Sequence, residues 1–307
     1  MGLYVQAKTP TEATARILEA ERAGVSQVWM TAISVAGCDT TTILGAAAAQ
    51  TKRIRLGTSI IPIYTRHPVV MAQQALTLND LAPGRFSLGV GVSHRRLMEE
   101  TFGVHMVSPL QYLREYVTVL RGALSNGKVD YHGSFLNVSY NSGRTADVPV
   151  LVSALGPKAF EVAGEISDGA ISWICPVPYL LGKAVPALRK GAAAAHRPAP
   201  PIVANVLVAF SEDFDRARDA ARGRVQWYSK APFYANMFAE SGNPLGTDGR
   251  VPDRLLEGLL VYGTRATIES RLRELLAGGL DELLVALVPT ADEGGEWGKL
   301  LDLIGSI

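Results

Sequence analysis

The stretch "RIRLGTSIIPIYTRHP", Arg53 to Pro68, decides the fold of this chain. It begins as a buried strand in which basic and apolar residues alternate up to Leu56, and then Gly57, Thr58 and Ser59 interrupt the apolar run. Small residues let other groups approach the backbone closely and permit irregular φ and ψ angles. The pattern predicts a strand that widens at its C-terminal end to receive a flat ligand, and the simpler alternative is a strand that ends in a turn.

Short β-branched runs alternate with helical patterns through almost the whole chain, as is typical of parallel βα units. The predicted strands are Leu3–Val5, Gln27–Thr31, Ile54–Ile61, Phe86–Gly91, Val148–Ser153, Gly169–Ile174, Ile202–Phe210 and Glu282–Val288. Eight strands with intervening helices in 307 residues favour an α/β fold of the closed (β/α)8 TIM-barrel type over an open doubly wound sheet. The first turn, "VQAKTPTEAT", also lacks a GxGxxG motif.

We expect residues 1–307 to form a single domain with two notable insertions. The segment "GKVDYHGSFLNVS", near residues 128–138, has two short alternating runs about Gly133 and predicts a hairpin. Residues 225–254 contain "QWYSKAPFYANMF" followed by a Gly/Pro-containing stretch. Such a long excursion on a barrel indicates either a lid or a subunit contact.

The overall charge indicates a small-molecule partner. The chain carries 30 Lys and Arg against 29 Asp and Glu, a net charge of +1, which favours neither nucleic acid nor an anionic membrane. Cys38 and Cys175 lie far apart without metal-type spacing, so we expect no metal site. The N-terminal residues lack the apolar run of a signal peptide or membrane span, and the expectation is a cytoplasmic protein with reduced thiols.

In a barrel of this kind the working site is built at the C-terminal ends of the strands. One such end, "VSALGPK", runs into a helix with Gly156 just before Pro157 at a plausible first helical position. Free backbone N–H groups and the helix dipole would form a phosphate seat there, although Gly-Pro turns also occur for steric reasons alone. Another strand end, "GVGVSHRR", carries His94, Arg95 and Arg96, which suit the binding of an anionic ligand. The alternative is that these residues only begin a solvent-exposed basic helix.

Taken together, five segments resemble the bacterial-luciferase-like (β/α)8 superfamily, and within it the branch that uses the deazaflavin coenzyme F420. The segments are "VWMT", "RIRLGTSIIPIYTRHPVVMAQQALTLNDLAPGRFSLGVGVS", "REYVTVLRGAL", "VPVLVSALGPKAFEVAGEISDGAIS" and "YGTRATIESRLRELLAGGLDELLV". They occur in the family's order and at suitable spacing. The resemblance implies a TIM barrel, a homodimer and F420 as cofactor, with FMN as the alternative.

The resemblance also implies the site residues. In deazaflavin members the third strand ends in a bulge with a non-prolyl cis peptide, which by position is Ser59–Ile60 here, and Trp173 would face the substrate. The expected cofactor-binding residues are Thr31, Ser59, Ile60, Gly91, Val92, Ser93, His94, Arg95, Arg96, Ser153, Ala154, Leu155, Gly156 and Pro157. Within this set, the two arginines would meet the acidic tail of F420, and the segment from Ser153 would present backbone groups to its phosphate.

The implied function is an oxidoreductase that transfers a hydride between F420 and a small organic substrate, as a reductase of a C=C, C=N or C=O group. Family members often place a polar pair containing histidine after the second strand, where this chain has Thr31 and Ala32. His94 is then the candidate proton donor, with Arg95 and Arg96 expected to lower its pKa, and water or Thr31 as the alternatives.

Two rival functions stay open at this point. One is a reduced-FMN-dependent monooxygenase of the same fold, whose phosphate seat would look identical. The other is a barrel that binds a flavin-type ligand without turnover, because the missing polar pair is what a decayed site would look like. A sugar-phosphate substrate is disfavoured, since nothing in the sequence marks a site for one.

Overall fold

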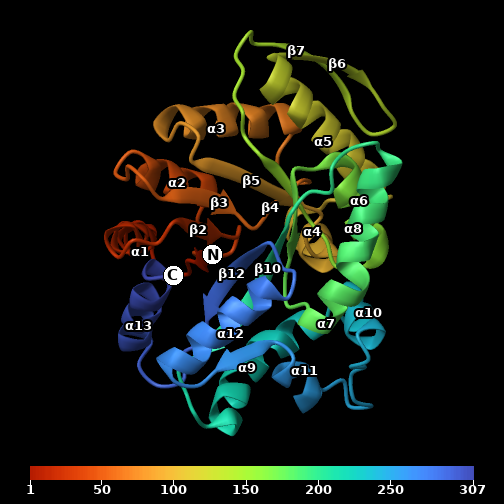
Figure 1. Cartoon of the computed structure of the whole chain (residues 1–307). Helices are drawn as coiled ribbons and strands as arrows, with labels where there is room; N and C mark the ends of the chain where they lie inside the picture. Colours follow the sequence, from red (N-terminus) through yellow and green to blue (C-terminus); the bar gives the residue numbers. More distant parts are fainter.

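A closed ring of parallel strands forms the centre of the molecule, and helices surround it (Figure 1). The computed structural model describes all 307 residues. The eight strands of the ring are β1 (Gly2–Tyr4), β2 (Gln27–Met30), β3 (Arg55–Thr58), β5 (Phe86–Gly91), β8 (Val150–Ser153), β9 (Gly169–Ser172), β10 (Ile202–Ala209) and β12 (Glu282–Leu287). Each pairs in parallel with its neighbours, and β12 closes the ring on β1. The predicted TIM barrel and its eight strands are confirmed.

The helices lie mainly outside the ring, and many connect consecutive strands (Figure 1). They are α1 (Pro10–Arg22), α2 (Thr40–Ala48), α3 (Pro68–Leu81), α4 (Arg95–Phe102), α5 (Pro109–Asn126), α6 (Pro157–Ile166), α7 (Val177–Tyr179), the π-helical turn η1 (Leu180–Ala184), α8 (Val185–Ala194), α9 (Phe214–Ser229), α10 (Pro232–Glu240), α11 (Asp253–Glu257), α12 (Arg265–Ala277) and α13 (Glu293–Gly305). None of them is long and apolar enough to span a bilayer.

The third barrel strand differs from its predicted form because it is interrupted. Regular pairing of β3 stops at Thr58, the Ser59–Ile60 peptide is cis, and pairing resumes at β4 (Ile61–Pro62), which binds the end of β5. The predicted bulge and cis peptide are therefore confirmed. The Ile60 carbonyl accepts from the Ala32 N–H at 3.1 Å, so the bulge is also tied to the loop after β2.

Close packing explains the small residues before the bulge. A Cβ atom on Gly57 would lie 2.3 Å from the ring of Trp29, so only glycine lets β3 pack against that buried indole. The Thr58 hydroxyl donates to the Gly89 carbonyl at 2.9 Å and accepts from the Gly89 N–H at 2.8 Å. These bonds fix β3 against β5 immediately before the chain leaves regular strand geometry.

The "RHP" that ends the opening stretch starts the next helix. Arg66 forms an ion pair with Asp39, the N-cap of α2, and thereby joins the loops that follow β2 and β4. His67 is the N-cap of α3, where its Nδ1 accepts from the Val69 N–H at 3.3 Å, and Pro68 occupies the first helical position. These are ordinary helix-start roles.

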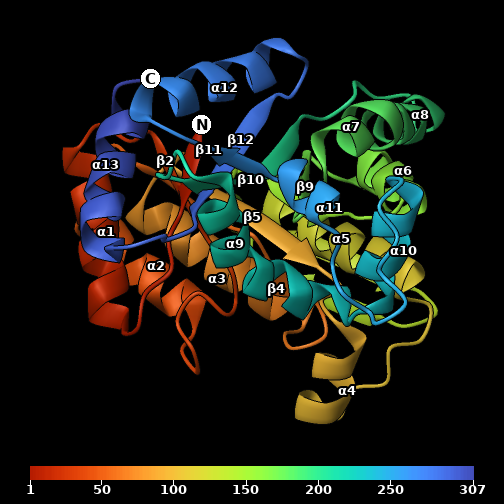
Figure 2. The same cartoon turned by 90° about the horizontal axis from the view of Figure 1, so that it is seen from below.

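The two expected insertions take different forms. β6 (Lys128–His132) and β7 (Asn137–Asn141) make an antiparallel hairpin beyond α5, away from the barrel ring (Figure 1). The later segment contains the end of α9, then α10 and α11, and leads into a short strand, β11 (Leu260–Tyr262), that pairs with β10. Figure 2 shows α9, α10 and α4 near the same end of the barrel.

Candidate active site

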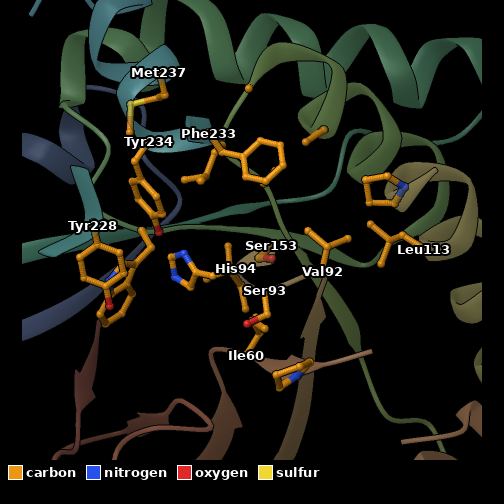
Figure 3. A pocket seen from close by; sticks show the side chains of 18 of the residues that line it. Ile60, Val92, Ser93, His94, Leu113, Ser153, Tyr228, Phe233, Tyr234 and Met237 are labelled. Atoms are coloured by element: carbon orange, nitrogen blue, oxygen red, sulfur yellow. The ribbon is translucent and has the colours of Figure 1, made fainter. Parts of the chain in front are cut away.

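A cavity of about 730 Å³ lies at the C-terminal ends of the barrel strands. Its lining comes from the segments that follow β2, β3, β5, β8 and β9, together with the start of α5, the end of α9 and α10. Figure 3 shows Ile60, Ser93 and Ser153 on one side of this space and Phe233, Tyr234 and Met237 on the other. The barrel mouth and the later insertion therefore enclose a single cavity.

The bulge after β3 contributes one face of the cavity. Ser59 and Ile60 both line it, and the buried Ser59 hydroxyl has no hydrogen-bond partner within the protein. The neighbouring Gly91 leaves no spare room, because a Cβ there would lie 2.0 Å from Ser153 Oγ and 3.2 Å from Ile60 Cγ1. An apolar side chain beside an unpartnered hydroxyl suits the face of a ring that has a polar edge.

The start of α6 contributes backbone donors. Gly156 is its N-cap without any side-chain hydrogen bond to the first turn, and the N–H groups of Leu155 and Gly156 have no backbone acceptor. Open space surrounds the position where a Gly156 side chain would stand. Lys158 also lines the cavity. An uncapped helix N-terminus with a lysine in its first turn fits a phosphate group.

Aromatic side chains form the opposite part of the lining. We call Trp173, Trp227, Tyr228, Phe233 and Tyr234 the aromatic wall. Trp173 follows β9, whereas the other four come from the end of α9 and the start of α10. Four of these rings form a continuous group, since Tyr228 lies 4.9 Å from both Trp227 and Tyr234 and 6.4 Å from Trp173 between ring centroids.

His94 lies between the bulge side and the aromatic wall. Its ring stacks on Tyr234 at 5.7 Å and an interplanar angle of 17°, and meets the edge of Trp227 at 5.2 Å. Burial among these rings lowers the pKa of His94 from its ordinary 6.5. We expected the two neighbouring arginines to lower this pKa; the direction is confirmed, but the cause is burial.

Arg95 and Arg96 do not line the cavity. The Arg95 guanidinium donates to Glu99 at 2.8 Å and to the Met106 carbonyl at 2.9 Å, and Arg96 pairs with Glu100 at 2.9 Å. Both belong to α4, which projects from the end of the barrel (Figure 2). Any contact with an acidic tail would therefore be at the rim, and it would compete with these helical i,i+4 pairs.

Thr31 lines the cavity at the position after β2. At this position members of the family that the sequence resembles often have a polar pair containing histidine. The Thr31 hydroxyl lies 3.3 Å from the Tyr4 hydroxyl and 3.4 Å from Ser34 Oγ. Tyr4 in turn packs edge-on against Trp173 at 5.1 Å. The position is thus occupied by a small network of hydroxyl groups, which can hold or pass a proton.

The sequence model of the luciferase-like monooxygenase family matches residues 2–282. The chain belongs to this family. Among curated members it is 26% identical over 285 residues to the 5,10-methylenetetrahydromethanopterin reductase of Methanolobus tindarius, covering 86% of each chain. It is 33% identical over 189 residues to the F420-dependent glucose-6-phosphate dehydrogenase of Microbacterium testaceum, covering 58% of this chain and 56% of that one.

Solved structures share the fold. An F420-dependent secondary alcohol dehydrogenase, in complex with an F420–acetone adduct, superposes with a TM-score of 0.82 at 18% identity, covering 100% of this chain and 97% of the other. At this identity the likeness supports the arrangement of the barrel. The roles of individual side chains in this luciferase-like chain must be argued from its own geometry.

The structure brings most of the expected site residues of this luciferase-like chain to one cavity. Those that line it are Thr31, Ser59, Ile60, Val92, Ser93, His94, Ser153, Ala154, Leu155, Gly156, Pro157 and Trp173. Gly91 does not line the cavity but packs against Ser153 and Ile60, which do, whereas Arg95 and Arg96 lie outside the cavity. Sequence reasoning missed the wall residues of α9 and α10, as well as Leu110 and Leu113 of α5. The run of aromatics in the insertion was the available signal.

Proposed function

We propose that this chain is an F420-dependent oxidoreductase that reduces a C=C, C=N or C=O group of a small organic substrate. The two curated relatives described above are a reductase, which aligns over 86% of the chain, and an F420-dependent dehydrogenase, which aligns over 58% of it. A reduced-FMN-dependent monooxygenase of the same fold is the second candidate, favoured by the fact that the phosphate seat would serve either cofactor.

One observation of the structure carries the cofactor site, and it fits F420 and FMN alike: a ring seat and a phosphate seat lie along the same cavity. Ile60 and the unpartnered Ser59 hydroxyl supply the first, and the uncapped start of α6 at Gly156 supplies the second. The residues present therefore fit a tricyclic ring joined to a phosphate-bearing chain. We propose that Val92 and Ser93 border the ring and that the segment Ser153–Pro157 receives the phosphate.

Reduced F420, when bound, supplies a hydride, which brings two electrons and one hydrogen nucleus. The chain must hold the substrate carbon against that seat, exclude water and deliver one proton to the other atom of the double bond. His94 and the Thr31 hydroxyl both line the cavity and are candidates for that delivery. Burial keeps His94 largely uncharged at neutral pH, while Tyr4 stands behind Thr31 as a second hydroxyl.

The deciding experiment is a titration of the purified apoprotein with F420 and, separately, with FMN. We expect F420 to bind more tightly. When F420H2 and a suitable carbonyl or alkene are supplied together, we expect F420H2 to be oxidised as the double bond is reduced. Equal or tighter binding of FMN, together with oxygen-dependent product formation, would replace this proposal with the monooxygenase. Binding without turnover on any substrate would favour a non-catalytic barrel.

We further propose a cytoplasmic homodimer. The homodimer rests on the family resemblance, and light scattering on the purified protein tests it; a monomer at micromolar concentration would contradict it.

A further inference from the structure

The aromatic wall presents a broad apolar surface to the cavity. Trp227 and Phe233 are 50% and 41% exposed, whereas Tyr234 is 5% exposed and its ring lies 6.0 Å from that of Phe238. Large half-exposed aromatics that line a cavity usually contact a ligand, because leaving them in water has no structural benefit. Figure 3 shows Phe233 and Tyr234 directed towards the space above His94.

Few charged side chains face this cavity. Among its lining residues only Lys158 and Glu240 are ordinarily ionised at neutral pH, and His94 has a lowered pKa. Lys158 lies in the first turn of α6, beside the proposed phosphate seat. The carboxylate of Glu240 accepts from the Tyr179 hydroxyl at 3.4 Å. The aromatic wall therefore has no cation of its own with which to pair an anionic substrate, and an unpaired charge there would be costly.

The wall also differs from an aromatic cage for a cation. A cage needs several ring faces directed at one central point. Here the rings are occupied with one another, since Trp227 meets Tyr228 edge-on at an interplanar angle of 84° and His94 stacks on Tyr234. The ring edges and faces that remain free for a ligand form a surface that suits a flat, uncharged molecule.

We infer that the substrate is an uncharged, planar compound, an aromatic or conjugated ring that carries the reducible bond and packs on the aromatic wall. The identity of the reacting bond rests on the proposed function, but binding to the wall does not. Phosphorylated sugars and carboxylates are disfavoured at this surface, because the wall offers no cation to pair with their negative charge.

Matched probes test the inference on the full-length protein. Calorimetric titrations of the apoprotein, and of the protein loaded with oxidised F420, would compare 2-naphthaldehyde, 2-naphthoate and glucose 6-phosphate at pH 7.5 in phosphate buffer, which fills the proposed phosphate seat of the apoprotein. We expect the uncharged aldehyde to bind at least tenfold more tightly than the carboxylate with the same ring system, and glucose 6-phosphate to bind most weakly. Comparable or tighter binding of either anion, or no binding of the aldehyde, would overturn the inference.

Variants locate the effect on the wall. Trp227→Ala should weaken 2-naphthaldehyde about tenfold, as expected for loss of a central aromatic anchor. Phe233→Arg should weaken the aldehyde and strengthen 2-naphthoate. The matched control is Phe102→Ala, which removes an aromatic side chain that is 51% exposed on α4 and does not line the cavity. An equal loss in the control, or none in Trp227→Ala, would refute the role of the wall.

The outcome is separable from that of the proposed function. If F420 fails to bind while the probes keep their expected order, the cofactor assignment fails and the substrate class stands. If F420 binds and the order of the probes is reversed, the substrate class fails alone.

Discussion

Gly91→Ala is the most direct test of the proposed ring seat, because this glycine sets the spacing between the ends of β5 and β8 and the bulge. The added Cβ would lie 2.0 Å from Ser153 Oγ, 3.0 Å from Ser153 Cβ and 3.2 Å from Ile60 Cγ1. The Ser153 hydroxyl can rotate away, but its Cβ cannot. The methyl group therefore pushes Ser153 or Ile60 towards the cavity that both of them line.

The expected size of the effect follows from those contacts. Inserting a methyl group into a tightly packed site costs about 1–3 kcal/mol of the free energy of unfolding. Replacing glycine by alanine returns about 0.4–1 kcal/mol by restricting the unfolded chain. The net loss of stability is about 0–2.6 kcal/mol, whereas a shift of Ile60 or Ser153 into the seat should weaken F420 at least tenfold, or about 1.4 kcal/mol.

Fluorescence titration with F420 and urea unfolding would measure the two effects separately. The matched control is Gly223→Ala in α9, where nothing lies within 4 Å of the added Cβ, so that F420 affinity should be unchanged. Adding Ser153→Ala to Gly91→Ala removes the shortest contact and should restore part of the stability. F420 affinity in Gly91→Ala equal to that of the wild-type protein would refute the assignment of this seat.

Three further predictions concern charged or titratable groups. Replacing Arg95 and Arg96 together by Ala should weaken F420 more than a tail-less deazaflavin, and less so at high salt, because exposed charges are screened; equal losses for both ligands would remove the tail assignment. Glu115→Gln should lower stability by about 2–3 kcal/mol in urea unfolding at pH 7, since the buried carboxylate accepts three backbone N–H bonds from the hairpin turn; an unchanged midpoint would contradict this. Burial raises the pKa of Glu115, but hydrogen bonds from Phe135 and its neighbours outweigh burial and lower the pKa below the ordinary 4.5. The stabilisation by this carboxylate is therefore fully present above pH 4.5 and is lost as the pH falls through the lowered pKa. His94→Gln should keep F420 affinity within a few-fold and lower turnover about 10²-fold; turnover at the wild-type rate would assign the proton to another group.

The barrel was predictable because its pattern is local. Each strand is a short apolar run, because both faces of a parallel sheet are buried. Glycines such as Gly57 mark positions where a large side chain of a neighbouring strand packs against the backbone. The predicted ends were too long by one or two residues at most strands, since residues such as Val5 and Val288 are buried and donate to a neighbouring strand but lie just past the last paired residue of their own strand. The interruption at Ser59–Ile60 depended on the family resemblance, because small residues alone also fit a plain turn.

The site was only partly predictable, because sequence order does not say which way an exposed side chain turns. His94 and Arg95 are adjacent, yet the first enters the cavity and the second pairs with Glu99 on the outside of α4. A basic run at a strand end looks the same in both cases. The start of α4 separates them, since His94 is its extended N-cap residue whereas Arg95 is its first helical residue, and the two backbone conformations direct their side chains differently.

The proposed cofactor seats and the aromatic wall lie on different parts of the fold. The substrate can therefore differ from those of related proteins while the proposed cofactor stays the same. The proposed ring and phosphate seats lie on barrel strands and on the start of α6, where Gly91 and Thr58 leave little freedom to change. The aromatic wall lies mostly on α9 and α10, in an insertion between β10 and β11 that tolerates substitution without disturbing strand pairing. Changes at Trp227 or Phe233 should therefore alter substrate preference while leaving the proposed cofactor seat intact.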